Sequence, residues 1–312
     1  MNKEAIPVIF LCDDRYLPHA ACAIASIVHQ SKRTYHFYLP NVGLSPENER
    51  KLKQWDLGRS MIHVVPLKKI PQLERHDMTH CYYTKAGLYV PAVPLLFPEL
   101  KRAIYLDSDV VVTSDLGELW DIDLGDKLMG VVYEDPFYPK QSLAQRKQKM
   151  NFPAGKKYFN NGVLLMNLEA MRALEIPQKI IQVLDDIPDL DFHEQDAQNI
   201  LLDPTQVLEL APEFNGLVAA PYARRCLSGR DWVCLHFNGP KPWNLYGWFV
   251  KVWPSFFCRC CRYYHEYLEL TPWANEVRTA LKPYKFIKQT LHLGREWLQQ
   301  KVNCFAERLF TR

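Results

Sequence analysis

Short apolar runs alternate with amphipathic segments along the first part of the chain. Residues 6–12 are almost continuously apolar and end at Asp13 and Asp14, a pattern typical of a buried parallel strand that runs into an acidic loop. Residues 20–28 suit a packed helix, and residues 35–39 and 61–65 indicate two further strands. Between these strands, Ser45, Pro46 and Glu47 form the N-terminal signal of a helix through residue 55. The alternation predicts an α/β fold with a doubly wound sheet, which binds ligands at the carboxyl ends of its strands.

The same alternation continues to about residue 237. Strands are predicted at residues 103–106, 110–113, 128–133, 162–168 and 232–237, with helices at residues 177–186 and 194–202. After Trp243 aromatic residues crowd the segment 248–267, and a helical tail follows. No Pro/Gly-rich linker is long enough to separate two independent domains, so we expect one mixed sheet in one domain.

Asp107 and Asp109 are the sharpest candidates for chemistry, because they interrupt an apolar run that would otherwise be buried throughout. On an extended segment the outer carboxylates of Asp-x-Asp project to the same side, where both can meet one hard divalent cation. Charges in such a place are normally paired or bound to metal. A second pair, Asp121 and Asp123, lies in a polar loop and is expected to be an ordinary surface pair. The sequence therefore predicts a metal site at the first pair.

His236 and Lys241 suggest a complement to that site. The histidine ends a predicted strand, and a glycine turn separates it from the lysine. An imidazole can complete a carboxylate site for a Mn-type ion, and a lysine can neutralise a phosphate. The alternative interpretation is a structural histidine followed by a Pro-rich turn.

Six segments then form an ordered signature: IPVIFLCDDRY, RAIYLDSDVVV, LGELWDIDLGD, KYFNNGVLLMNL, HEQDAQN and HFNGPKPWN. In order and spacing they resemble the motifs of retaining glycosyltransferase family 8, especially the galactosyl- and glucosyltransferases of bacterial lipopolysaccharide and lipooligosaccharide. The resemblance covers roughly residues 5 to 275. It implies the GT-A fold, an α/β domain that binds a nucleotide sugar through an Asp-x-Asp metal centre.

The resemblance also assigns roles to individual residues. It implies that Mn²⁺ (or Mg²⁺) is held by Asp107, Asp109 and His236, and that Lys241 contacts the diphosphate of the donor. The remaining donor-binding positions are Asp13, which would face the uracil, and Arg15, Tyr16, Ser108 and Gly239. A diphosphate leaving group needs no general acid, unlike the leaving alcohol of a glycosidase substrate.

Three further matches concern the sugars. Asn160 matches a position near the donor sugar, although Asn-Asn-Gly is also an ordinary turn sequence. Gln195 matches a position beneath the anomeric carbon, and Glu194 stands where close relatives carry an aspartate; both also open a predicted helix, where an acidic residue is favourable in any case. Glu134 corresponds to an acidic position that contacts the acceptor.

The chain departs from the family pattern at three places. Val90 stands where the family usually has an arginine, and Lys85 is a candidate substitute. Arg15 replaces a commoner asparagine, and the spacing from His236 to Lys241 is one residue shorter than in some relatives. These departures bear on donor identity rather than on the fold.

Composition adds the cellular setting. The formal net charge of the 312 residues is only +3, which disfavours a nucleic-acid binder. Nine cysteines, mostly within apolar runs, favour a reducing compartment over a disulfide framework, and the N-terminus lacks a secretory signal, so we expect a cytoplasmic protein. The cluster Cys258, Cys260, Cys261 and His265 does not match the usual zinc spacing and is expected to belong to an aromatic-rich helical surface.

The tail, residues 276–312, differs from the catalytic domain, residues 5–275. From Lys282 onward seven Lys or Arg face two Asp or Glu. Six apolar residues fall on one helical stripe, as in an interfacial helix on anionic lipid: Ile287, Leu291, Leu298, Val302, Phe305 and Leu309. We therefore expect peripheral attachment to the inner face of the cytoplasmic membrane, with a helix docked on the body or on a second subunit as the alternative.

Together these features predict a Mn²⁺-dependent retaining glycosyltransferase. It would move a hexose from UDP-galactose or UDP-glucose to a lipopolysaccharide-type acceptor. Two alternatives stay open: a metal-dependent phosphohydrolase or nucleotidyltransferase, for which the sequence lacks a second His/Asp cluster, and a catalytically weak sugar-nucleotide-binding protein.

Overall fold

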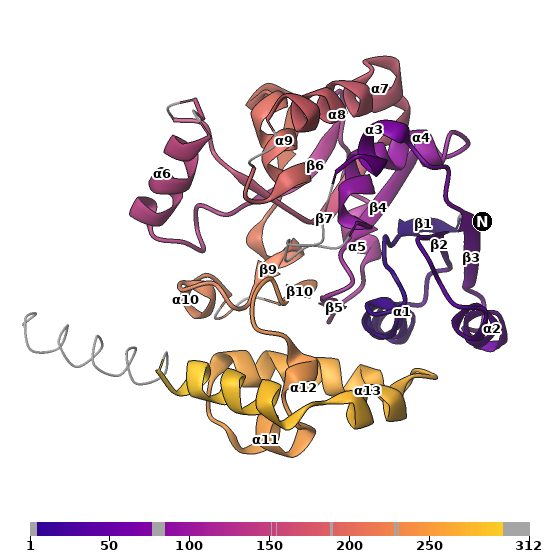
Figure 1. Cartoon of the computed structure of the whole chain (residues 1–312), viewed down its shortest axis with the longest axis vertical. Helices are drawn as coiled ribbons and strands as arrows, with labels where there is room; N and C mark the ends of the chain where they lie inside the picture. The colour runs from indigo at the N-terminus through magenta and orange to yellow at the C-terminus, as the bar shows by residue number, and fades with distance from the viewer. Residues whose placement is uncertain are drawn as a thin grey trace, which may run out of the picture.

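A computed structural model describes residues 5–76, 85–150, 152, 153, 155–187, 190–227, 229 and 231–295. A seven-stranded sheet in the order β3-β2-β1-β4-β7-β6-β8 forms its centre (Figure 1). Strands β3, β2, β1 and β4 are parallel, whereas β7 is antiparallel to both β4 and β6. The predicted α/β fold with a mixed sheet is thus confirmed. The strands are β1 (Ile6–Ile9), β2 (Tyr35–Asn41), β3 (Met61–Pro66), β4 (Arg102–Leu106), β6 (Met129–Tyr133), β7 (Phe159–Asn167) and β8 (Val207–Glu209).

Helices cover both faces of this sheet. Helix α2 (Pro46–Gln54) begins as predicted, because the Ser45 side chain accepts a hydrogen bond from the backbone N–H of Asn48 and Pro46 occupies the first turn. The other helices are α1 (Leu17–Gln30), α3 (Pro71–Glu74), α4 (Val93–Leu96), α5 (Gly117–Trp120), α6 (Lys140–Lys149), α7 (Leu168–Ala173), α8 (Ile176–Asp186), α9 (His193–Leu201), α10 (Ala223–Leu227), α11 (Gly247–Val252), α12 (Phe256–Leu268) and α13 (Ala274–Ala280).

A second, three-stranded sheet in the order β5-β10-β9 corrects the prediction of a single sheet. It contains β5 (Val110–Val112), β10 (Cys234–His236) and β9 (Gly216–Leu217). The chain leaves β4 at Asp107 and turns, with the Val110 N–H donating to the Asp107 carbonyl at 3.3 Å, so that β5 pairs with β10 instead. Buried strands in either sheet have the same apolar pattern, so the pattern did not reveal the change of sheet.

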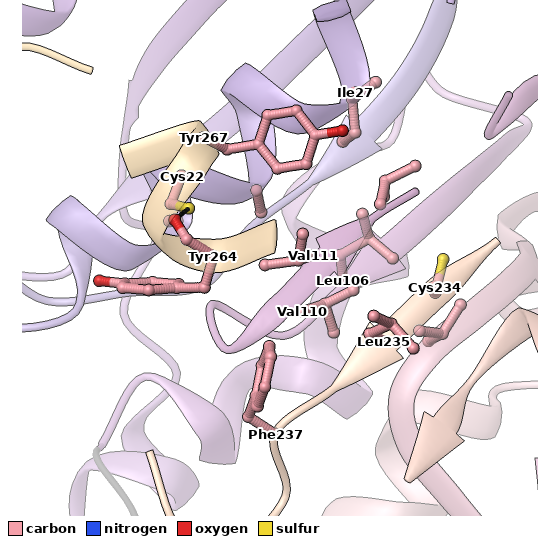
Figure 2. Packing of buried hydrophobic residues seen from close by; sticks show 14 of the residues in the cluster. Cys22, Ile27, Leu106, Val110, Val111, Cys234, Leu235, Phe237, Tyr264 and Tyr267 are labelled. Atoms are coloured by element: carbon pink, nitrogen blue, oxygen red, sulfur yellow. Dashed lines mark hydrogen bonds between the residues drawn. The ribbon is translucent and has the colours of Figure 1, made fainter. Parts of the chain in front are cut away.

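The small sheet packs into a core shared with α1 and α12. Figure 2 shows side chains of these elements close together, including Val110 and Val111 of β5, Cys234, Leu235 and the adjacent Phe237, Cys22 and Ile27 of α1, and Tyr264 and Tyr267 of α12. The backbone N–H of Val112 also donates to the Ser26 hydroxyl of α1 at 2.9 Å. This packing fixes β5 and β10, the two strands that flank the predicted metal site.

The cysteine cluster of α12 is part of that core. Cys258, Cys260 and Cys261 are buried, which corrects the expectation that they lie on a helical surface. Burial raises the pKa of the Cys260 thiol to about 12, so it is a packing residue rather than a reactive thiol. The seven cysteines within the described ranges are free thiols.

The beginning of the tail is docked on the body beside α11 and α12 (Figure 1). Phe286 contacts the rings of Tyr246 and Phe249, and Leu293 is buried. Ile287 and Leu291 of the predicted stripe are more than half exposed, whereas its other four members lie outside the described residues. Among helices of the described part of the chain, none has the length and apolar character needed to cross a membrane.

Candidate active site

One cavity at the carboxyl ends of β1 and β4 collects most of the predicted site. Its volume of about 200 Å³ exceeds the roughly 30 Å³ that one water occupies in the liquid, so it has room for more than one ion. Predicted residues that line it are Tyr16, Asp107, Ser108, Asp109, Glu134, Asn160, Glu194, Gln195, His236 and Lys241. Segments far apart in the sequence therefore meet at one place.

Asp107, Asp109 and His236 form a compact group of metal-binding side chains. The His236 Nε2 lies 3.3 Å from Asp109 Oδ1 and 3.7 Å from Asp107 Oδ2. One ligand atom from each residue falls within 4.8 Å of the others, as ligands of one ion must. Two carboxylates and an imidazole suit a divalent Mn-type cation. The sequence predicted that an extended segment would bring the two carboxylates to the same side. This expectation was wrong, because residues 107–109 form a turn, and the turn brings the carboxylates together.

Charges beside this group set the ionisation of the two carboxyls. Burial, followed by the neighbouring charge of Asp109, raises the pKa of Asp107 to about 6. Burial would also raise the pKa of Asp109, but Lys241 and then His236 outweigh it and hold that pKa well below its usual range. The Lys241 ammonium is hydrogen-bonded to Asp109 and also donates to the Phe237 carbonyl at 2.7 Å. Asp109 is therefore a carboxylate over the whole physiological range.

Gly162 on β7 makes room for the imidazole. A Cβ placed on this glycine would lie 2.2 Å from His236 Cε1 and 2.4 Å from Nδ1, where a non-bonded contact needs about 3.5 Å. The backbone cannot easily retreat, because the Gly162 carbonyl accepts the Asp107 N–H at 2.8 Å in the sheet. Only glycine fits at this position. The sequence alone had indicated that this glycine was part of an Asn-Asn-Gly turn.

Buried amides fill the other half of the cavity. Asn160 Nδ2 donates to Glu134 Oε1 at 3.1 Å and to Gln195 Oε1 at 3.2 Å, and Gln195 Nε2 donates to the same Glu134 oxygen at 3.1 Å. All three side chains are buried. The predicted sugar-facing residues are thus one hydrogen-bonded cluster.

Glu194 and Asn161 offer polar atoms to a ligand in this cavity. Glu194 Oε2 and both polar atoms of the Asn161 side chain are buried and have no hydrogen-bond partner. Burial raises the pKa of Glu194 to about 8, so its carboxyl is largely protonated at neutral pH. Buried polar groups normally have partners, and both residues line the cavity, where a bound ligand could supply them.

Of the remaining predicted donor residues, Tyr16 and Ser108 line the cavity. Asp13 binds the N–H groups of Arg15 and Tyr16 and pairs with the Arg15 guanidinium at 2.9 Å. A Cβ on Gly239 would contact Ala219 at 3.2 Å. Asp13, Arg15 and Gly239 are not among the side chains that line the cavity in the described part of the chain.

Ion pairs and hydrogen bonds occupy two features singled out in the sequence, namely Lys85 and the second Asp-x-Asp pair. Lys85, the candidate substitute for the family arginine, pairs with Glu74 at 3.0 Å and does not line the cavity, while Val90 is buried in the core. Asp121 pairs with Arg33 and Asp123 accepts the Gly125 N–H, so this second Asp-x-Asp has structural partners.

Sequence reasoning missed Asn215, Gly162, Asn161 and Tyr105. The Asn215 side chain lies 3.0 Å from His236 Nδ1. Asn215 follows a short 3₁₀ turn, and nothing in its local pattern separates it from any loop asparagine. The Tyr105 hydroxyl donates to Asp107 Oδ1 at 2.6 Å. Its position on β4, two residues before Asp107, could have suggested this contact.

Comparison with known proteins agrees with this geometry. The model of glycosyl transferase family 8 matches residues 7–246. The chain belongs to glycosyl transferase family 8. General stress protein A of Bacillus subtilis (strain 168) is 30% identical over 264 residues, which cover 78% of this chain and 90% of that protein. A lipopolysaccharide 1,2-glucosyltransferase of Escherichia coli is 26% identical over 331 residues, covering 99% of this chain and 90% of that protein.

Solved structures share the fold of this family 8 glycosyltransferase. Galactosyltransferase LgtC, solved in complex with donor and acceptor sugar analogs, superposes with a TM-score of 0.68 at 22% identity, covering 87% of this chain and 100% of that chain. The bifunctional glycosyltransferase WbbM gives a TM-score of 0.67 at 20% identity, covering 89% of this chain and 52% of that chain. The family and the GT-A-like fold expected from the sequence are confirmed.

Proposed function

We propose that the chain is a metal-dependent retaining hexosyltransferase that uses UDP-galactose or UDP-glucose. The observation that carries the proposal is that Asp107, Asp109, His236 and Lys241 share one cavity with the buried cluster around Gln195. A cation- and phosphate-binding half thus adjoins a half suited to hydroxyl groups.

Asp107, Asp109 and His236 would hold Mn²⁺ or Mg²⁺, and the absence of a side chain at Gly162 leaves the space that His236 needs. When bound, the cation supplies Lewis-acid stabilisation of the negative charge that develops on the leaving diphosphate. We propose Mn²⁺ rather than Mg²⁺, because an imidazole nitrogen is a better ligand for Mn²⁺ than for Mg²⁺.

Lys241 is placed to serve the same leaving group. Its ammonium reaches Asp109, and an anionic diphosphate at this site would compete for it. The Lys241 backbone is held at both its N–H and its carbonyl by the Gln289 amide, at 3.2 and 2.8 Å, so the tail contributes to its placement. Tyr16, Ser108, the turn that holds Asp13 and Arg15, and Gly239 would complete the donor site.

Asn160, Gln195 and Glu194 would surround the donor sugar, and Glu134 would meet the acceptor. The side-chain amide oxygen of Gln195, Oε1, already accepts a hydrogen bond from the Asn161 backbone N–H at 3.0 Å. Glu194 Oε2, which has no hydrogen-bond partner, is therefore the atom best placed to gain a sugar hydroxyl. A protonated carboxyl can donate to that hydroxyl and accept from it.

The acceptor that we propose is a lipopolysaccharide-type glycan. Support comes from the lipopolysaccharide 1,2-glucosyltransferase relative, which matches nearly the whole chain. An acceptor carried by a lipid is met at a membrane, and Trp248, Val252, Tyr284, Ile287 and Leu291 are large hydrophobic side chains that are more than half exposed. Together with the basic tail they support peripheral attachment to the inner face of the cytoplasmic membrane.

The direct test is a panel of UDP-sugars with Mn²⁺, in which release of UDP is followed without acceptor. Slow hydrolysis of UDP-galactose or UDP-glucose is expected. Binding of UDP-sugars without any turnover, with or without acceptor, would favour the sugar-nucleotide-binding alternative. Proton NMR of a transfer product should show the α configuration of the donor, and a β product would overturn the retaining mechanism.

A further inference from the structure

Two backbone N–H groups fix the orientation of the buried amides beside the metal site. The Gly162 N–H donates to Asn160 Oδ1 at 2.9 Å, and the Asn161 N–H donates to Gln195 Oε1 at 3.0 Å. A backbone N–H can only donate, so each partner atom must be the amide oxygen. The side chains of Asn160 and Gln195 are therefore oriented by the backbone of β7.

The orientation of Asn215 follows from that of Asn160. One end of the Asn215 amide lies 2.9 Å from Asn160 Oδ1 and must be its NH₂ group, since an oxygen can only accept. The other end, Oδ1, then faces His236 Nδ1 at 3.0 Å. Asn215 is 0% exposed and His236 3% exposed, so solvent does not compete for this contact. The Nδ1 atom must therefore carry a proton, and Nε2 points at Asp107 and Asp109.

We infer that Asn215 is a positioning residue, which holds the proton on Nδ1 of His236 so that Nε2 presents its lone pair to a divalent cation between Asp107 and Asp109. The inference rests on the metal site of the proposed function. A histidine ligand binds a metal through one nitrogen only when the other holds the proton, and the group that accepts this proton's hydrogen bond also orients the ring. No other acceptor for Nδ1 is present among the described residues.

The test uses the full chain with two substitutions at the same position. Asn215→Ala removes the acceptor, whereas Asn215→Asp keeps an acceptor for Nδ1–H but loses the donor to Asn160. Asn238→Ala is a matched control, because Asn238 lines the same cavity but donates to Tyr138 instead of facing His236. Thermal unfolding of each variant reports whether the fold is kept.

The first measurement is NMR of metal-free protein labelled with ¹⁵N-histidine, in which the His236→Gln spectrum identifies the His236 signals. The wild-type, Asn215→Asp and Asn238→Ala proteins should show a Nδ1–H that exchanges slowly with water, whether or not Nε2 is protonated. Asn215→Ala should lose this slow exchange. A merely structural role of Asn215 would not change which nitrogen keeps its proton.

The second measurement is the Mn²⁺ affinity with UDP present, followed by water proton relaxation. Asn215→Ala should bind Mn²⁺ roughly 10–100-fold more weakly, the usual effect of losing the partner of a metal-binding histidine, while Asn215→Asp stays close to wild type. If Asn215→Ala binds Mn²⁺ like wild type, or if wild-type His236 lacks the protected Nδ1–H, the inference is wrong. Wild-type protein that binds no Mn²⁺ would overturn the proposed function as well, so the two failures can be told apart.

Discussion

Gly162→Ala should disable the metal site by displacing His236. The new Cβ would lie 2.2, 2.4 and 2.9 Å from Cε1, Nδ1 and Nε2 of the ring, against about 3.5 Å for an ordinary contact, so the ring must move by more than about 1 Å. Metal–ligand distances tolerate only about 0.2 Å, so His236 can no longer act as a ligand. We expect a loss of Mn²⁺ affinity on the order of 100-fold, comparable to the largest effects of losing a histidine's supporting partner.

Turnover should fall with the affinity, since a misplacement of about 1 Å in an active site can cost about 100-fold in rate. The assay is Mn²⁺ titration with UDP present, together with UDP release from the donor sugar. Gly247→Ala is the matched control. A Cβ placed on Gly247 would have His265 Nδ1, at 3.8 Å, as its nearest neighbour, and neither residue lines the cavity of the metal site. Gly162→Ala protein that unfolds at the wild-type temperature, binds Mn²⁺ within twofold of wild type and turns over normally would refute the reasoning.

Three further predictions address charge and location. Glu194→Gln should flatten the pH dependence of the unfolding free energy between about pH 4.5 and pH 8. The pKa of Glu194 is raised in the folded protein, so protonation of this carboxyl at low pH stabilises the folded state. In the wild-type protein this stabilisation is lost as the pH rises through about 8, whereas a glutamine does not titrate. Denaturant unfolding at several pH values checks it, and equal slopes for both proteins would contradict it. Lys241→Met should raise the pKa values of both Asp107 and Asp109, because the Lys241 ammonium lowers both. Asp107 has the higher pKa of the two, so the acid limb of the pH–rate profile should move to higher pH with it; an unchanged limb would count against the role of Lys241. Removing residues 296–312 should weaken co-sedimentation with anionic liposomes, especially at low salt, since each lost Lys or Arg near the surface contributes about 1 kcal/mol; equal binding of both forms would argue for a docking or dimer-forming tail.

The site of that truncation reflects what the structure adds to the sequence. A chain stopped before Lys282 would also lose Gln289, which holds the Lys241 backbone, and Leu293, which is buried in the core. The apolar stripe predicted an exposed helical face, and Ile287 and Leu291 are exposed. The stripe could not show that Gln289, on the opposite face of the same segment, holds the backbone of Lys241 beside the cavity.

Most of the strands, the helices α1, α2, α8 and α9, and the pair Asp107 and Asp109 could be predicted because each has a local signal. The short strands β8 and β9 were not predicted, and the ligand role of His236 came from the family resemblance. Apolar runs locate β1, β2 and β4, Ser45 locates the start of α2, and Asp107 and Asp109 stand out as charges at the end of a buried strand. The assignment of β5 and β10 to a second sheet depends on long-range pairing, which leaves no local trace. The same holds for Asn215 and Gly162, whose importance comes entirely from their distance to His236.

The Glu194 position shows how burial changes the meaning of a residue. In sequence it is an acidic residue in the first turn of a helix, where a negative charge is favourable. In the structure it is buried beside Asp107 and Asp196, and its pKa is raised to about 8. A sequence pattern cannot report this, because the desolvation arises from segments far apart in the chain.

The most direct test of the central claim is UDP release from UDP-galactose and UDP-glucose, measured with Mn²⁺, with EDTA and after Mn²⁺ is restored. The account predicts turnover of at least one donor that stops in EDTA, returns with Mn²⁺, and is abolished by Asp109→Ala in protein that remains folded. Full turnover in EDTA, or an Asp109→Ala protein as active as wild type, would contradict the assignment of Asp107, Asp109 and His236 as the metal site.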